Sequence, residues 1–215
     1  MKKDKTELVF VIDRSGSMGG LEGDTIGGVN AVLAKNREVE GKAYVTTVLF
    51  DHQIEYLHDH VDLHKVADLT SKDYYVRGCT ALLDAVGDAI THIERVRHYV
   101  PKQFRAKKVI VTIVTDGLEN ASKRFTYAQV KQLIEEKTAK GWEFIFLGAN
   151  IDVAAEAGKL GIAQEYAAPY VADEAGTMVA YDAVACAQVM SRTVGAAAPS
   201  WANAVRADAA ARAKH

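Results

Sequence analysis

The sequence predicts an α/β domain with a central, mainly parallel sheet and helices on both faces. Two runs rich in apolar, β-branched residues, Glu7–Asp13 and Lys107–Thr115, have the character of strands that are buried on both sides. Segments with helical periodicity separate these and the other strand candidates. Strands that alternate with helices along a chain form parallel sheets joined by right-handed crossovers.

The first half of the chain is predicted to hold three strands and two long helices. Apolar residues recur at helical spacing after Gly19 and again after Thr80, where Leu82, Leu83 and Val86 begin the pattern. The expected elements are a strand at Glu7–Asp13, a helix at about Leu21–Val39 that ends at Gly41, a strand at Ala43–Phe50, an antiparallel edge strand at about Ile54–His58, a short helical segment at Val61–Leu69 and a helix that opens at Thr80.

The second half is predicted to continue the alternation. Glycines at 141 and 161 mark helix ends, because glycine readily adopts the left-handed conformation of a C-terminal cap. The expected elements are a strand at Lys107–Thr115, a helix at Tyr127–Lys140, a strand at Trp142–Leu147, a helix at Asp152–Leu160, a short strand at Glu165–Ala168 and a long helix at Asp173–Val194. We assign residues 1–195 to one domain. Residues 196–215 form an alanine- and arginine-rich C-terminal tail to which we assign no fixed conformation, with Trp201 as a possible anchor.

Composition limits the classes of partner. The 215 residues suffice for one well-buried domain, and the net charge of −2 gives no general attraction to nucleic acid or to an anionic membrane. We therefore expect neither partner. No apolar run is long enough to span a bilayer or to form a secretory leader, so we expect a cytoplasmic protein. Cys79 and Cys186 are then reduced thiols, and Cys186 is expected in the packed core.

Polar residues follow the two strongest strand candidates and open the middle helix. Asp13, Ser15 and Ser17 follow the first strand, Thr80 opens the helix, and Asp116 follows the strand that ends at Thr115. The carboxyl ends of neighbouring parallel strands meet at a switch point of the sheet, so these five side chains are expected in one crevice. Two carboxylates and three hydroxyls are hard oxygen donors, which suit Mg²⁺, Mn²⁺ or Ca²⁺.

This pattern resembles the metal-ion-dependent adhesion site (MIDAS) of the von Willebrand factor type A family. That motif is Asp-x-Ser-x-Ser, then a distant Thr, then a distant Asp that is usually followed by Gly. Asp13, Ser15 and Ser17 match its first part, Thr80 its second and Asp116 its third. The resemblance covers about residues 5–195 and implies a Rossmann-like, doubly wound fold. Cys79 departs from the glycine that often precedes the threonine in the family.

The resemblance also implies a function. In the family the serines and the threonine bind the metal directly, and the aspartates bind it directly or through water. A cation held mainly by neutral hydroxyls keeps much of its charge and can accept a Glu or Asp carboxylate from a partner protein. The expected activity is metal-dependent protein binding without catalysis. Compact family members of this kind are commonly subunits or adaptors of larger assemblies, including ones that contain ATPases.

Each part of the pattern has a simpler interpretation on its own. An aspartate followed by hydroxyls is a common turn, Thr80 could be a helix N-cap, and Asp116-Gly117 could be a turn after a strand. The order and placement of all the parts favour the metal site. Arg14, within the metal loop, is expected to face a partner. His58, His60 and His64 are expected in a solvated loop, because no cysteine lies near enough to complete a zinc site.

An enzymatic alternative comes from the phosphotransferases of the haloacid dehalogenase type. Asp-Arg-Ser-Gly-Ser resembles their nucleophile loop, with Asp13 as the nucleophile, and the segment 116–120 resembles their acidic metal loop. Lys102, Lys107 or Lys108 could then supply their lysine. Ser15 argues against this function, because it stands where most such phosphatases carry a second aspartate as general acid.

Overall fold

A six-stranded sheet forms the centre of the molecule, in a computed structural model that describes residues 5–212. The strand order is β3-β2-β1-β4-β5-β6, and all pairs are parallel except β2 with β3. The strands are β1 (Thr6–Asp13), β2 (Ala43–Phe50), β3 (Ile54–Asp62), β4 (Lys108–Thr115), β5 (Glu143–Gly148) and β6 (Ala167–Pro169). This confirms the predicted mostly parallel sheet with one antiparallel edge strand.

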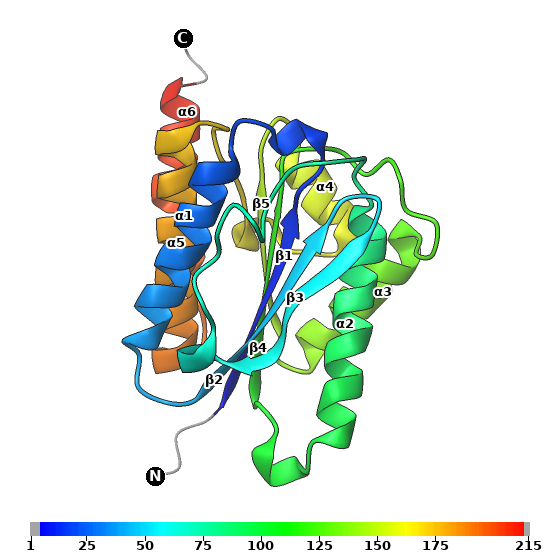
Figure 1. The fold of residues 1–215 in the computed structure, drawn as a ribbon, viewed down its shortest axis with the longest axis vertical. Helices are drawn as coiled ribbons and strands as arrows, with labels where there is room; N and C mark the ends of the chain where they lie inside the picture. Colours follow the sequence, from blue (N-terminus) through cyan, green and yellow to red (C-terminus); the bar gives the residue numbers. More distant parts are fainter. Residues whose placement is uncertain (1–4, 213–215) are drawn as a thin grey trace.

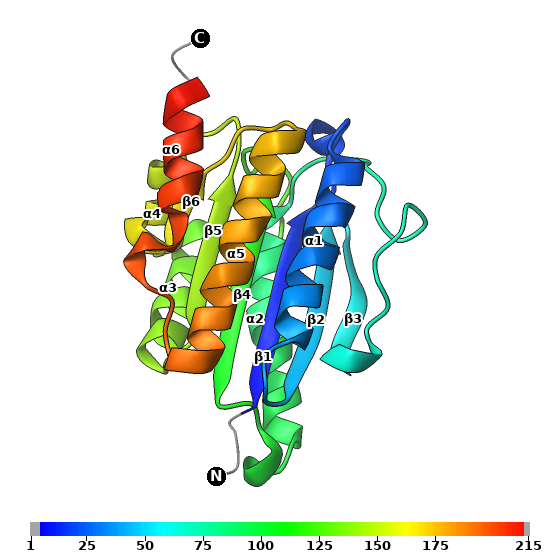
Figure 2. The same cartoon turned by 90° about the vertical axis from the view of Figure 1, so that its left-hand side faces the viewer.

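Helices cover both faces of the sheet (Figures 1 and 2). One face carries α1 (Glu22–Arg37), α5 (Glu174–Val194) and α6 (Asn203–Arg212), and the other carries α2 (Leu82–Tyr99), α3 (Tyr127–Ala139) and α4 (Val153–Leu160). Successive residues of β1 alternate between the two cores: Leu8 and Phe10 pack towards α1 and α5, and Val9 and Val11 towards α2 and α3. Both cores therefore need apolar residues from β1, which explains its continuous hydrophobic run.

Helices α1 and α5 pack closely because α1 carries glycine at the point of contact. A Cβ on Gly28 would lie 2.3 Å from a ring carbon of Tyr181. Tyr181 is buried, and its ring occupies the space that a side chain at position 28 would fill. Gly28 thus serves packing between the two helices, and the sequence of this segment has no phosphate-binding P-loop pattern.

The C-terminal tail has a defined conformation, which the sequence analysis did not predict. Residues Pro199–Ala202 form a 3-10 turn that leads into α6, and Trp201 is buried. The Trp201 Nε1 donates to the carbonyl of Glu165 at 2.9 Å, and the Arg206 guanidinium donates to the carbonyls of Gln164, Glu165 and Ala167. These bonds fix the tail beside β6, as the position of α6 in Figure 2 shows. Trp201 is the anchor that the sequence suggested.

Three further expectations need correction. Strand β3 continues to Asp62, so His58 and His60 lie in a half-buried strand and not in a solvated loop; the helical segment expected at 61–69 shrinks to the turn Leu63–Lys65. Cys186 is exposed, because it lies on the solvent side of α5 between the buried residues Ala185 and Ala187.

None of the helices within residues 5–212 has both the length and the apolar character needed to cross a bilayer.

Candidate metal centre

The site lies where the parallel strands β1 and β4 end side by side. The connections after these strands lead to opposite sides of the sheet, to β2 and to β5, so the carboxyl ends of β1 and β4 form the switch point of the sheet. Asp13 is the last residue of β1 and Asp116 follows β4. The loop after β1 carries Ser15 and Ser17, and the Gly16 amide donates to the carbonyl of Gly78 at 3.1 Å. This backbone bond brings the segment that contains Thr80 to the same place.

Four of the five predicted side chains form one continuous chain of hydrogen bonds. The Thr80 hydroxyl donates to Ser15 Oγ at 2.9 Å, and Ser15 Oγ lies 3.1 Å from Ser17 Oγ. The Ser17 hydroxyl donates in turn to Asp116 Oδ1 at 2.5 Å. Residues from three separate segments of the sequence thus converge, as the strand ends predicted.

Asp13, the fifth residue, is fully buried beneath this chain. Its Oδ1 accepts from the Ser15 amide at 2.7 Å, and its Oδ2 accepts from the Thr115 hydroxyl at 2.6 Å. Burial raises the pKa of Asp13 to about 6, against the lowering effect of these hydrogen bonds. Burial also raises the pKa of Asp116, and the bond from Ser17 opposes it. Two desolvated carboxylates in one crevice are the kind of charge that a cation would compensate.

The residues present fit a hard divalent cation. Gly117 has no side chain, and a Cβ there would lie 3.1 Å from Ser17 Oγ and 3.3 Å from Thr80 Oγ1. The glycine therefore leaves open the space that both hydroxyls border. Among the described residues, no group of three or more His, Cys, Asp or Glu side chains is placed to hold a metal. Any metal at the candidate site would therefore depend on neutral hydroxyl ligands as well as on carboxylates.

The loop after β4 positions Thr80, a role that the sequence analysis did not identify. Asn120 Oδ1 accepts from the Thr80 amide at 2.9 Å, and the Asn120 amide donates to the Thr80 carbonyl at 3.0 Å. Glu119 accepts from the Leu83 amide at 2.9 Å and so caps α2, which begins at Leu82. Thr80 is therefore not the N-cap: its hydroxyl faces Ser15. The acidic run 116–120 was noticed in the sequence, but as a feature of a phosphotransferase.

Tyr74 is a second contributor that the sequence does not reveal. Its hydroxyl donates to the backbone carbonyl of Asp13 at 2.6 Å, and its side chain is buried. The two residues are far apart in the sequence and only the fold brings them together. This bond holds the end of β1 against the segment that leads to Thr80.

Arg14 faces the interior, which overturns the expectation that it meets a partner. Its side chain is fully buried, and its guanidinium forms ion pairs with Asp51 at 3.3 Å and Glu55 at 2.8 Å. Asp51 also accepts from Arg77 Nε at 2.6 Å, and its carbonyl accepts from the Ala81 amide at 2.9 Å. Asp51 thus joins the β2–β3 turn, the metal loop and the segment before α2. A buried arginine is retained only where it is paired, as it is here.

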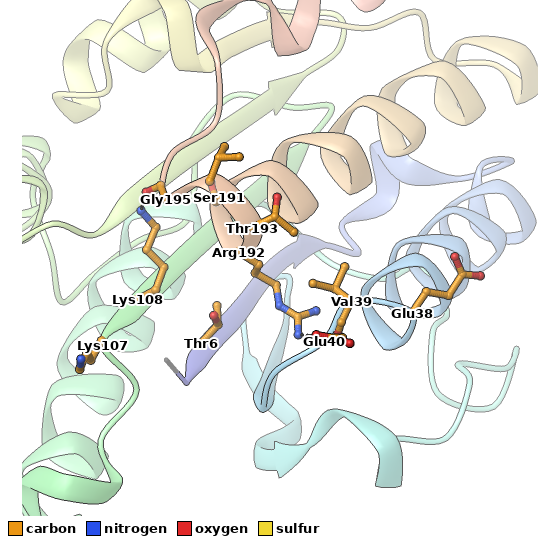
Figure 3. Close-up of a pocket in the computed structure, with 11 residues that line it drawn as sticks. Thr6, Glu38, Val39, Glu40, Lys107, Lys108, Ser191, Arg192, Thr193 and Gly195 are labelled. Atoms are coloured by element: carbon orange, nitrogen blue, oxygen red, sulfur yellow. Dashed lines mark hydrogen bonds between the residues drawn. The ribbon is translucent and has the colours of Figure 1, made fainter. Parts of the chain in front are cut away.

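The lysines proposed for the phosphotransferase lie at the wrong end of the sheet. Lys108 begins β4 and Thr115 ends it, so Lys108 is a strand length, about 23 Å, from the site. Lys107 and Lys108 instead line a cavity of about 870 Å³ at the opposite end (Figure 3). In that cavity Lys108 donates to the carbonyl of Gly195 and pairs with Glu143, and Arg192 donates to the carbonyls of Val39 and Gly41. The Arg192 bonds hold the end of α5 to the segment after α1, and Lys108 connects β4 to the residue after α5 and to β5.

Comparison with known proteins identifies the fold. No family model matches the sequence, and no characterised protein matches it by sequence. Proximal thread matrix protein 1 from the mussel byssus, with a zinc-occupied MIDAS motif, is similar over 85% of this chain with a TM-score of 0.58 and 16% identity. This chain spans 45% of the length of the mussel protein.

Two further solved structures are similar. The von Willebrand factor domain of the pilus tip protein Mfa5 from Porphyromonas gingivalis has a TM-score of 0.60 and 13% identity, covering 85% of this chain and 94% of that one. Manganese-loaded TRAP protein from Plasmodium vivax has a TM-score of 0.56 and 14% identity, covering 83% of this chain and 72% of that one. The sheet order, the helices on both faces and these likenesses agree: the chain has the von Willebrand factor type A fold.

Proposed function

We propose that the chain is a metal-dependent protein-binding module. Asp13, Ser15, Ser17, Thr80 and Asp116 would hold one divalent cation, with Mg²⁺ as the first candidate and Mn²⁺ or Ca²⁺ as alternatives. A partner protein would supply a Glu or Asp carboxylate. When bound, the cation supplies a positive charge that neutral hydroxyls leave largely uncompensated.

One observation carries this proposal: the chain of hydrogen bonds from Thr80 through Ser15 and Ser17 to Asp116, beside the space that Gly117 leaves open. Three segments of the sequence meet there: two supply hydroxyls and the third supplies the carboxylate of Asp116. The similar structures with zinc at a MIDAS motif and with manganese loaded support a divalent cation in this fold.

The same geometry favours binding over catalysis. Both oxygens of Asp13 are engaged by Thr115 and Ser15, and the side chain is fully buried, so it is poorly placed to attack a substrate. Ser15 also offers no carboxyl group for proton transfer. A non-enzymatic role, a cytoplasmic location and membership of an assembly that contains an ATPase complete the proposal.

The first experiment is calorimetric titration of Mg²⁺ and Mn²⁺ into the protein and into Asp13→Ala and Ser17→Ala variants. We expect binding to the parent chain and its loss in both variants. Ser71→Ala removes an exposed hydroxyl that is none of the five candidate ligands, and is the matched control. Unchanged metal binding in Asp13→Ala would refute the proposed centre.

The second experiment tests the partner carboxylate. The immobilised protein is incubated with cell extract in Mg²⁺ or in chelator, and Ser17→Ala is run in parallel. A partner of the proposed kind is retained only by the parent chain in Mg²⁺, and replacing one of its exposed Glu or Asp residues abolishes retention. Retention of the partner that is unchanged by chelator and by Ser17→Ala argues against the proposed function.

A further inference from the structure

A basic projection lies at the end of the molecule opposite the candidate metal centre. The last turns of α2 and the 3-10 turn Lys102–Phe104 extend beyond the sheet edge, as the lower part of Figure 1 shows in green. We call residues 95–105 the basic hairpin. In a chain of net charge −2, the basic hairpin holds four Lys or Arg residues and no Asp or Glu; the four are Arg95, Arg97, Lys102 and Arg105.

Two arginines of the basic hairpin, Arg97 and Arg105, donate to backbone carbonyls. Arg105 Nε donates to the carbonyl of Val100 at 2.7 Å and its Nη2 to that of His98 at 3.1 Å, and Arg97 donates to Ala106. Glu94, just before the hairpin, pairs with Lys137 at 2.6 Å. The charge of Arg97 is partly compensated, because nearby Glu7 and Glu94 oppose the lowering of its pKa by burial. Arg105 is oriented by backbone carbonyls.

Exposed aromatic residues accompany this charge. Tyr99 is 79% exposed and Phe104 is 51% exposed. Lys5 Nζ lies 4.6 Å above the centre of the Phe104 ring and donates to the Phe104 carbonyl at 3.2 Å, which fixes the ring at the surface. Arg95, Arg97, His98 and Arg105 border a shallow hollow of about 490 Å³ beside them, and Glu94 is the one acidic residue in its lining. Exposed aromatics combined with arginine are typical of residues that dominate protein interfaces.

Acidic residues limit the size of this surface. Glu136 pairs with Lys137 and Lys140 on one side, and Glu38 and Glu40 line the cavity beside Lys107 and Lys108 on the other (Figure 3). A nucleic-acid strand needs a positive track along several phosphates, and an anionic membrane would bring its headgroups against these acids. A short anionic segment of a protein avoids both conflicts.

We propose that the basic hairpin is a second docking site, independent of metal, for a short acidic peptide segment that also carries apolar residues. Carboxylates pair with the oriented arginines, and the apolar side chains cover Tyr99 and Phe104. Two separate ends of one domain would then engage acidic partners, one through the candidate cation and one through arginine.

The test is fluorescence anisotropy with a labelled peptide of alternating Glu and Leu residues, in low salt with chelator present. The chelator and a parallel measurement on Asp13→Ala exclude any contribution of the metal centre to peptide binding. A failure of the peptide to bind is therefore distinct from a failure of the proposed metal-dependent function. We expect binding to both proteins, and at least a tenfold loss in the double variant Arg95→Glu, Lys102→Glu. A matching peptide with Gln in place of Glu is expected not to bind.

The matched control is Lys65→Glu, Lys72→Glu, which changes the net charge equally at two exposed lysines elsewhere. It must retain binding, because a loss there would mean general charge attraction and would overturn the proposal. Equal or tighter binding of a single-stranded RNA, or of vesicles that contain phosphatidylserine, would also overturn it. Absence of peptide binding to the folded parent chain would do the same. Thermal melting checks that both double variants fold.

Discussion

Residues that never reach a metal decide how the candidate ligands are held. The Thr115 hydroxyl donates to the Asp13 carboxylate, and the Tyr74 hydroxyl donates to the Asp13 backbone carbonyl. Asn120 accepts a hydrogen bond from the backbone amide of Thr80. Each acts through another residue, as groups around metal ligands commonly do. The ligand side chains can then keep one arrangement without relying on the cation alone to organise them.

Thr115→Val provides a test of this positioning. The substitution keeps the shape of the side chain and removes the hydroxyl that donates to Asp13 Oδ2. We expect the affinity for Mg²⁺ to fall by about tenfold, at the lower end of the effects seen for residues that orient metal ligands. Calorimetric titration measures it.

The control for this variant lies on the same strand. Thr112 is also buried in β4, and its hydroxyl accepts from Gln188 Nε2 at 3.0 Å on the side of α5. Thr112→Val should lower the melting temperature comparably and leave metal affinity intact. If both variants lose metal affinity equally, the effect of Thr115 is only loss of stability.

At the level of elements, the contact between α1 and α5 depends on a missing side chain. The ideal Cβ of residue 28 would lie 2.3 Å from the Tyr181 ring, while a Cβ on Gly27, the next residue, would meet nothing within 4 Å. Two adjacent glycines in one helix thus have opposite roles. One permits close packing, and the other only weakens the helix.

This difference predicts opposite effects of the same substitution. Gly28→Ala should lower the free energy of unfolding by about 1–3 kcal/mol, because it overpacks the helix interface. Gly27→Ala should raise it by up to about 1 kcal/mol through helix propensity. Chemical denaturation of both variants measures these changes. Equal effects in the two would show that α1 and α5 are not in close contact.

The half-buried His60 of β3 pairs with the buried Glu7 of β1, and this pair should make stability depend on pH. His60 Nδ1 lies 2.7 Å from Glu7 Oε2, and this hydrogen bond raises the pKa of His60 above its usual value. The pair therefore stabilises the folded state, and this contribution is fully present below pH about 6.5, the pKa of histidine in the unfolded chain. The contribution is lost as the pH rises through the higher pKa of His60 in the folded protein. Burial lowers the pKa of His58, with the opposite sign.

We therefore expect the free energy of unfolding of the parent chain to fall, relative to His60→Asn, as the pH is raised from about 5.5 to 8.5. Asparagine suits the positive φ of 52° at this position, and the contribution of His58 is common to both proteins. Denaturant titration across this range gives the difference. His64→Asn, an exposed histidine, should follow the parent chain; an identical pH dependence in His60→Asn would contradict the role of the pair.

The elements show which features the sequence can predict. The predicted strand Ala43–Phe50 is confirmed residue for residue, and all six strands were found, because buried strands have a strong local pattern. The convergence of Ser15, Ser17, Thr80 and Asp116 follows from topology alone. Arg14 and Tyr74 could not be placed, since their partners Asp51 and the Asp13 carbonyl are brought near only by the complete fold. Cys186 was wrongly predicted to be buried, because the buried face of α5 includes its neighbours Ala185 and Ala187 and not Cys186 itself.

At the scale of the whole molecule, the tail is part of the body of the protein. Trp201 is 7% exposed, and its Nε1 donates to Glu165, just before β6. Helix α6 then packs against both β6 and α5. The last strand is therefore covered by residues of a tail to which the sequence analysis assigned no fixed conformation. The candidate metal centre lies on β1 and β4, two strands away from β6.

Trp201→Ala should therefore weaken the fold and spare the site. We expect the free energy of unfolding to fall by about 3 kcal/mol, as for other large buried side chains, with Mg²⁺ affinity unchanged in the folded protein. Denaturation and calorimetry test the two parts. Val194→Ala removes an exposed side chain nearby in the sequence and should change stability by less than about 0.5 kcal/mol. A loss of metal affinity in Trp201→Ala would mean that the tail acts on the metal loop.

The margins of the sheet restrict how this protein can join others. At one margin β6 is three residues long and lies against α6; at the other, β3 has an irregular register with β2 and a left-handed residue at His60. Both features disfavour pairing with a strand from another chain. We therefore expect higher-order structures that include this molecule to form through contacts between side chains and loops rather than by extension of its sheet.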